Sequence, residues 1–100
     1  MATSASTLSP VAALCRELVR IPSLPGQEGP LAAAVAAWME AAGLAVEIDA
    51  FGNVLGLRRG LGPGPTLLLD AHLDTVPATD PGDWTHPPFA AEVSDGRLWG

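Results

Sequence analysis

The chain has 100 residues, of which 48% are apolar, and a formal net charge of −6. This length allows one domain at most, or part of one, and the apolar fraction is too high for a disordered chain. All five basic residues are arginines, so there is no basic patch for nucleic acid or an anionic membrane surface. The apolar runs are also far shorter than the ~20 residues that a membrane span needs. We therefore expect neither nucleic acid nor a membrane as a partner.

The N-terminal segment and the single cysteine bear on location. Residues 1–8 read as a polar tail without the basic and apolar regions of a secretory signal, so a cytoplasmic location is the default expectation. One cysteine, Cys15, excludes a disulfide within the chain. Because Cys15 falls in an amphipathic helical stretch, we predict that it is a small buried core residue.

Two helices are predicted in the first half of the chain. Ser9 followed by Pro10 suits an N-cap and the first position of a helix. That helix ends at Ile21, because the residue before a proline is pushed out of the α region. Pro30 opens a second helix after a connection rich in proline and glycine, and Gly43 is well placed as its stop.

Strand patterns follow the second helix. Residues 44–48 alternate between apolar and polar, and residues 54–57 form a second short strand, so the two predict a hairpin. The continuous apolar run at 66–69 predicts a central strand buried on both faces of a sheet. Residues 92–99 read as strand, turn and strand. The pattern predicts the opening of a layered α/β domain that is incomplete, with a compact α+β domain of 100 residues as the alternative.

Ionisable residues appear abruptly after the predicted central strand. Asp70, His72 and Asp74 lie at its carboxyl end, where ligand crevices form in α/β sheets. In an extended backbone His72 and Asp74 project to the same face. One nitrogen of a neutral imidazole can then bind a metal while the other donates to the carboxylate. Taken alone, this pair favours the simpler interpretation, a hydrogen-bonded histidine at a strand end; Asp70 and the Thr-Val-Pro turn that follows strengthen the case for a site.

The surrounding sequence resembles a known family. Residues 71–77 are similar to the first metal motif of the zinc metallopeptidases that include aminoacylase-1, acetylornithine deacetylase, succinyl-diaminopimelate desuccinylase and carboxypeptidase G. Residues 18–28 resemble the exit of the family's first helix, and residues 51–54 resemble its hairpin. Residues 84–100 resemble the lead-in to its second metal motif. The resemblance thus extends from residue 10 to the end of the chain.

The resemblance implies a fold and a chemistry. Residues 9–100 would be the N-terminal portion of a three-layer α/β/α catalytic domain that carries two zinc ions, although cobalt or manganese could occupy such a site. His72 would be a ligand of one zinc. Asp74 would be the catalytic-site acid that orients the His72 ring, and Asp70 is a candidate for lining the site. The reaction would be hydrolysis of an amide bond in a peptide or an N-acyl amino acid.

The resemblance also implies what residues 1–100 lack. The bridging aspartate, the general-base glutamate, the remaining ligands and the dimerisation domain would lie beyond Gly100, whereas a catalytic zinc needs at least three protein ligands. We therefore expect an N-terminal fragment that is inactive alone, with a homodimer only for the complete protein. The alternatives are a truncated, non-catalytic relative that folds or binds a partner, and a standalone metal-binding module. His86 is expected to be an ordinary loop residue.

Overall fold

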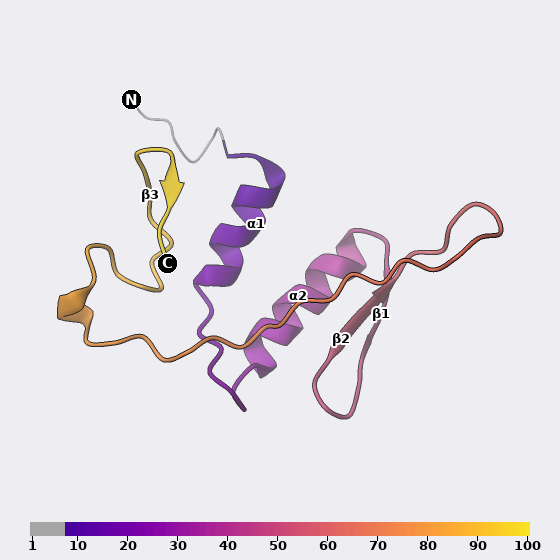
Figure 1. Ribbon diagram of the computed structural model, residues 1–100, viewed down its shortest axis with the longest axis horizontal. Coiled ribbons are helices and arrows are strands. Elements are labelled where there is room, and N and C mark those ends of the chain that lie inside the picture. Colours follow the sequence, from indigo (N-terminus) through magenta and orange to yellow (C-terminus); the bar gives the residue numbers. More distant parts are fainter. Residues whose placement is uncertain (1–7) are drawn as a thin grey trace.

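The computed structural model describes residues 8–100, which form two helices, two small hairpins and long irregular connections (Figure 1). Except for Leu8, the predicted polar tail lies outside the described residues. This is a small α/β arrangement with two antiparallel sheets of two strands each. The three-layer domain stays a prediction, because the elements of residues 8–100 do not form three layers.

Helix α1 (Pro10–Val19) begins where the sequence predicts. The Ser9 hydroxyl accepts a hydrogen bond from the backbone N–H of Ala12 at 3.2 Å, and Pro10 occupies the first turn. The helix ends two residues before Ile21. The prediction that Cys15 is buried is wrong, because its side chain is exposed. Leu14 faces α2. Because successive residues of a helix are rotated by about 100°, Cys15 points in a different direction.

Helix α2 (Gly29–Ala41) begins one residue before Pro30 and buries Leu31, Ala32 and Ala36. Gly43 has a φ of +91°, so it takes the left-handed conformation that ends helices, as predicted. No helix in residues 8–100 is long and apolar enough to cross a membrane.

The predicted hairpin is confirmed as β1 (Ala45–Ile48) and β2 (Val54–Leu57), which pair in antiparallel register. Helix α2 packs against it at Gly56, where an added Cβ would lie 2.7 Å from the Met39 sulfur.

Asp49 closes the turn between β1 and β2. Its Oδ1 accepts from the backbone N–H groups of Phe51 and Asn53, and its Oδ2 accepts from the Asn53 side-chain amide, each at 2.9 Å. These bonds, with the Asn53 side chain as the largest cause, lower the pKa of Asp49 from 3.8.

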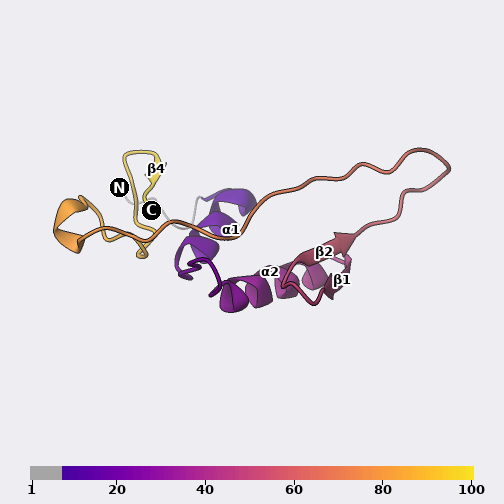
Figure 2. The same ribbon diagram turned by 60° about the horizontal axis from the view of Figure 1, so that its bottom comes forward.

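The prediction of a buried central strand at 66–69 is wrong. Leu67, Leu68 and Leu69 are 83%, 83% and 85% exposed, and residues 58–80 form no strand. In Figure 2 this run leaves β2, makes a wide loop and returns past the helices without joining a sheet. Within residues 8–100 the sheets contain only the pairs β1–β2 and β3–β4, so the run at 66–69 pairs with no strand.

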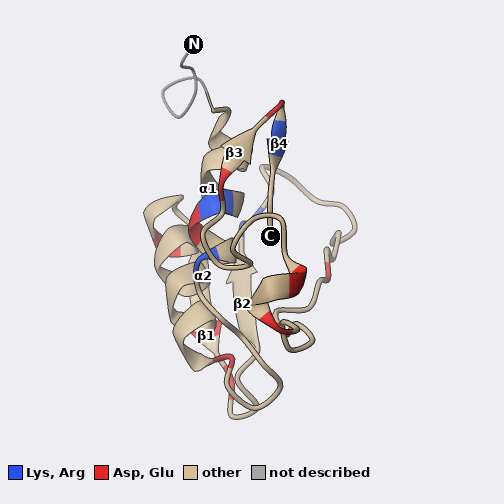
Figure 3. Ribbon diagram, turned by 90° about the vertical axis from the view of Figure 1, so that its left-hand side faces the viewer, with Lys and Arg blue, Asp and Glu red and all other residues tan. Residues whose placement is uncertain are grey.

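The C-terminal part carries a 3-10 turn, η2 (Pro81–Asp83), and the hairpin of β3 (Val93–Ser94) and β4 (Arg97–Leu98). The predicted strand, turn and strand are therefore confirmed. Asp95 and Gly96 have φ values of 54° and 73°, the two positive values of a tight hairpin turn. In Figure 3, the basic positions on α1 and β4 lie apart from each other.

Candidate metal-binding site

His72 and Asp74 meet as the sequence predicts. The Nδ1 atom of His72 lies 2.9 Å from the backbone carbonyl oxygen of Asp74 and 3.1 Å from its Oδ1. A carbonyl oxygen can only accept, so the hydrogen-bond network assigns the proton of the neutral ring to Nδ1. The Nε2 atom then carries the free lone pair, which is the form of histidine that binds a metal.

Both side chains are open to solvent. The His72 side chain is 84% exposed and that of Asp74 is 45% exposed. No hydrogen bond within residues 8–100 occupies Nε2 of His72. A histidine that donates one ring N–H to a carboxylate and presents the other nitrogen is the arrangement found at protein metal sites. The pair therefore fits one ligand of a zinc ion together with the acid that orients it.

The segment that carries this pair is held by Ser23, a contact that the sequence analysis missed. The Ser23 hydroxyl donates to the carbonyl oxygen of Leu73 at 2.8 Å, and the backbone N–H of Thr75 donates to the carbonyl oxygen of Ser23 at 2.9 Å. Ser23 is 2% exposed. The one indication in the sequence was that Ser23 lies in residues 18–28, which resemble the exit of the family's first helix. That resemblance did not indicate a contact with residues 73–75.

Asp70 does not join the pair in a ligand cluster. It is exposed, and residues 8–100 contain no group of three or more His, Cys, Asp or Glu side chains that could hold a metal ion. His72 is thus a single candidate ligand within the described chain. The role of Asp70 in lining the site stays a prediction.

The second histidine makes contacts of a different kind. His86 Nδ1 lies 2.6 Å from Oε1 of Glu92, and its ring stacks on Trp99 with ring centres 4.2 Å apart. The Trp99 indole N–H in turn donates to Ser94. These contacts link the loop to the β3–β4 hairpin, as expected for a loop residue.

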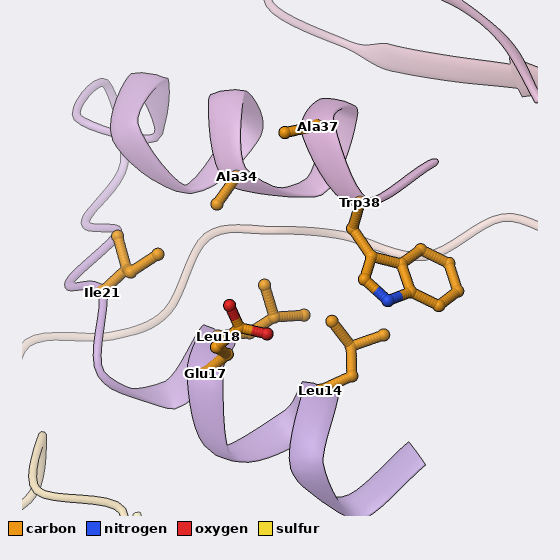
Figure 4. Close-up of a pocket in the computed structure, with 7 residues that line it drawn as sticks. All are labelled: Leu14, Glu17, Leu18, Ile21, Ala34, Ala37 and Trp38. Atoms are coloured by element: carbon orange, nitrogen blue, oxygen red, sulfur yellow. The ribbon is translucent and has the colours of Figure 1, made fainter. Parts of the chain in front are cut away.

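A cavity of about 300 Å³ lies between α1 and α2 (Figure 4). Its lining is apolar apart from Glu17 and includes Leu14, Leu18 and Trp38. Because it shares no residue with the His72 segment, it is not part of the candidate metal-binding site.

Comparisons with known proteins agree with the motifs. No family model matches the chain, and no solved structure matches it. Two curated relatives are named succinyl-diaminopimelate desuccinylase. The chain is 41% identical over 101 aligned residues to the succinyl-diaminopimelate desuccinylase of Methylobacterium sp. (strain 4-46), with 95% of this chain and 25% of the relative covered. It is 37% identical over 94 residues to the same enzyme of Methylorubrum extorquens (strain PA1), with 88% and 24% covered.

The recognition made from the motifs is confirmed at the level of homology: over 88–95% of its length, this chain is homologous to succinyl-diaminopimelate desuccinylases. It spans about a quarter of the length of these curated relatives.

Proposed function

We propose that this chain supplies a metal ligand and its orienting acid to a zinc-dependent amide hydrolase that releases an acyl group from an N-acyl amino acid or a peptide. The observation that carries the proposal is the His72–Asp74 pair, in which Nδ1 is held by Asp74 and Nε2 has no partner within residues 8–100. The names of the relatives support the deacylating reaction and make a succinyl group the first acyl group to test.

The two side chains would have distinct roles. His72 would bind zinc through Nε2, and Asp74 would keep the proton on Nδ1, which fixes the ring orientation and makes Nε2 a stronger donor. When bound, zinc lowers the pKa of water and polarises the amide carbonyl. In the overall reaction the oxygen of water bonds to the acyl carbon, the C–N bond breaks, and the amine leaves with a proton while the acyl group becomes a carboxylate.

The remaining parts of such a site would come from outside residues 8–100. A catalytic zinc site uses three protein ligands, and His72 is the single candidate that the described chain offers. The relatives are about four times as long as the matched region, which leaves room for the other ligands and for a general base. We therefore propose that the 100-residue chain alone does not catalyse hydrolysis.

A chimeric enzyme tests this function. The chain would replace the matched quarter of the Methylobacterium desuccinylase, and release of succinate from N-succinyl-diaminopimelate would be measured together with bound zinc. We expect an active chimera. His72→Ala should lower bound zinc and abolish most of the activity, and Asp74→Ala should lower activity about 10- to 100-fold. His86→Ala is the matched control, because His86 binds Glu92 instead.

Two results would contradict the proposal. One is a His72→Ala chimera that keeps its zinc and its activity. The other is a chimera that folds and binds no zinc and hydrolyses nothing, which would favour the alternative of a non-catalytic relative.

A further inference from the structure

We propose that Ser23 is a positioning residue that sets the orientation and the tautomer of His72. Its importance for catalysis rests on the proposed function, whereas its effect on the His72 ring does not. Ser23 lies in the turn after α1, and it reaches across 50 residues of sequence to Leu73.

The two hydrogen bonds of Ser23 fix both peptide units that flank Asp74. The hydroxyl of Ser23 holds the carbonyl of Leu73, which belongs to the peptide unit before Asp74. The carbonyl of Ser23 accepts from the N–H of Thr75, which belongs to the peptide unit after Asp74. We refer to these two bonds as the Ser23 clamp.

The clamp acts on His72 through a planar peptide. The N–H of Thr75 and the carbonyl of Asp74 belong to one peptide unit and point in opposite directions. Holding the N–H against Ser23 therefore aims the Asp74 carbonyl away from Ser23, and this carbonyl accepts the Nδ1 proton of His72 at 2.9 Å. In this way the position of Ser23 sets the direction of the Asp74 carbonyl, and that carbonyl holds the proton on Nδ1 of His72.

Nothing else in the described chain holds this segment by its backbone. Residues 60–78 belong to no strand, and the clamp supplies the backbone hydrogen bonds that join them to the rest of residues 8–100. Ser23 is 2% exposed, so water cannot readily take the place of its hydroxyl. Loss of the hydroxyl removes the bond to Leu73 and keeps the backbone bond from the Thr75 N–H to the Ser23 carbonyl. With one of its two bonds gone, the clamp should hold the Leu73–Thr75 backbone less firmly, and with it the carbonyl that orients His72.

Nuclear magnetic resonance of the 100-residue chain tests the proposal. The nitrogen shifts of the His72 ring would be recorded at about pH 9, where histidine rings are neutral. In the parent chain we expect the Nδ1–H form. Ser23→Ala should move the ring toward a mixture of both tautomers and speed the exchange of the Thr75 amide about fivefold or more. Ser23→Thr, which keeps the hydroxyl, should restore both signals.

A matched control is Ser94→Ala, which removes a hydroxyl that accepts from Trp99 and should leave the His72 ring unchanged. The proposal is overturned if Ser23→Ala leaves the tautomer and the Thr75 exchange as they are. It is also overturned if Ser23→Ala collapses the amide signals of the β1–β2 hairpin, because Ser23 would then serve folding in general. The chimera assay can fail while this test succeeds, so the two proposals are judged separately.

Discussion

At the scale of single residues, Asp49 and Asp74 each use a carboxylate to bind a residue close by in the sequence. Asp49 accepts bonds from Phe51 and Asn53, which order a turn. Asp74 accepts from the ring of His72, two residues before it, which orders a candidate ligand. A charged carboxylate is a stronger hydrogen-bond acceptor than a neutral oxygen. The consequence for Asp49 can be measured as a function of pH.

The β1–β2 turn should weaken in acid because of Asp49. Its pKa is lower in the folded chain than the ordinary 3.8, since the ionised form accepts the turn's hydrogen bonds. The stabilisation is therefore fully present above the unfolded value and is lost as the pH falls through the folded value. We expect the protection of the Asn53 amide, which is its exchange rate relative to that of an unstructured amide at the same pH, to decrease below the ordinary value of 3.8.

Asp49→Asn should remove this acid transition. Asp95→Asn is the control, because Asp95 lies in the turn of the other hairpin. An Asp49→Asn chain with the same acid transition as the parent would show that another group is responsible.

At the scale of elements, the junction between α2 and β1 depends on Gly43. Its φ of +91° is strained for any residue with a Cβ, while an added Cβ there would meet no atom within 4 Å. The cost of a substitution is therefore one of backbone conformation and not of packing.

Gly43→Ala should lower the free energy of unfolding by about 1–2 kcal/mol, as measured by urea titration. Gly60→Ala is the matched control: Gly60 also has free space for a Cβ, and it has no positive φ. We expect that variant to be stabilised by about 0.4–1 kcal/mol, because alanine restricts the unfolded chain. Equal effects of the two substitutions would refute the conformational argument.

Elements governed by local chemistry were predictable from the sequence. The Ser9 cap, the Gly43 stop and the turn between β3 and β4 depend on neighbouring residues. The error at 66–69 has a different origin, because a strand needs a partner and an apolar run does not say whether one is present.

In the candidate site, too, one contact was predictable from the sequence and another was not. The spacing of His72 and Asp74 predicted their contact, since residues two apart in an extended backbone share a face. The link from Ser23 to Leu73 spans 50 residues and left no local pattern in the sequence. The wrong prediction for Cys15 arose because a helical stretch shows which faces are apolar but not which of them meets a neighbour.

At the scale of the whole molecule, residues 8–100 are more open than a compact domain. The radius of gyration is 16.2 Å, against about 13 Å for a compact chain of 100 residues. Leu67, Leu68 and Leu69 stand out from this open shape with their side chains in water. Adjacent exposed apolar side chains on an unpaired extended segment favour association between chains.

We expect the chain to self-associate through residues 67–69. Replacing Leu67, Leu68 and Leu69 together by serine should shift the chain toward monomer in sedimentation velocity runs over a range of concentrations. Leu61→Ser is the control, because Leu61 is fully exposed yet stands alone between glycines. If the triple variant associates as strongly as the parent, these leucines are not the contact.

The Ser23 clamp also has a consequence for the order of folding. Its hydroxyl and the carbonyl of Leu73 are 50 residues apart, whereas the β1–β2 hairpin joins residues 6 to 12 positions apart. Closing a long loop costs more chain entropy than closing a short one, so contacts of high sequence separation are slower to form. The helices and the hairpin can therefore form first and shorten the free path between Ser23 and Leu73. His72 would take its final orientation as one of the last events of folding and lose it as one of the first events of unfolding.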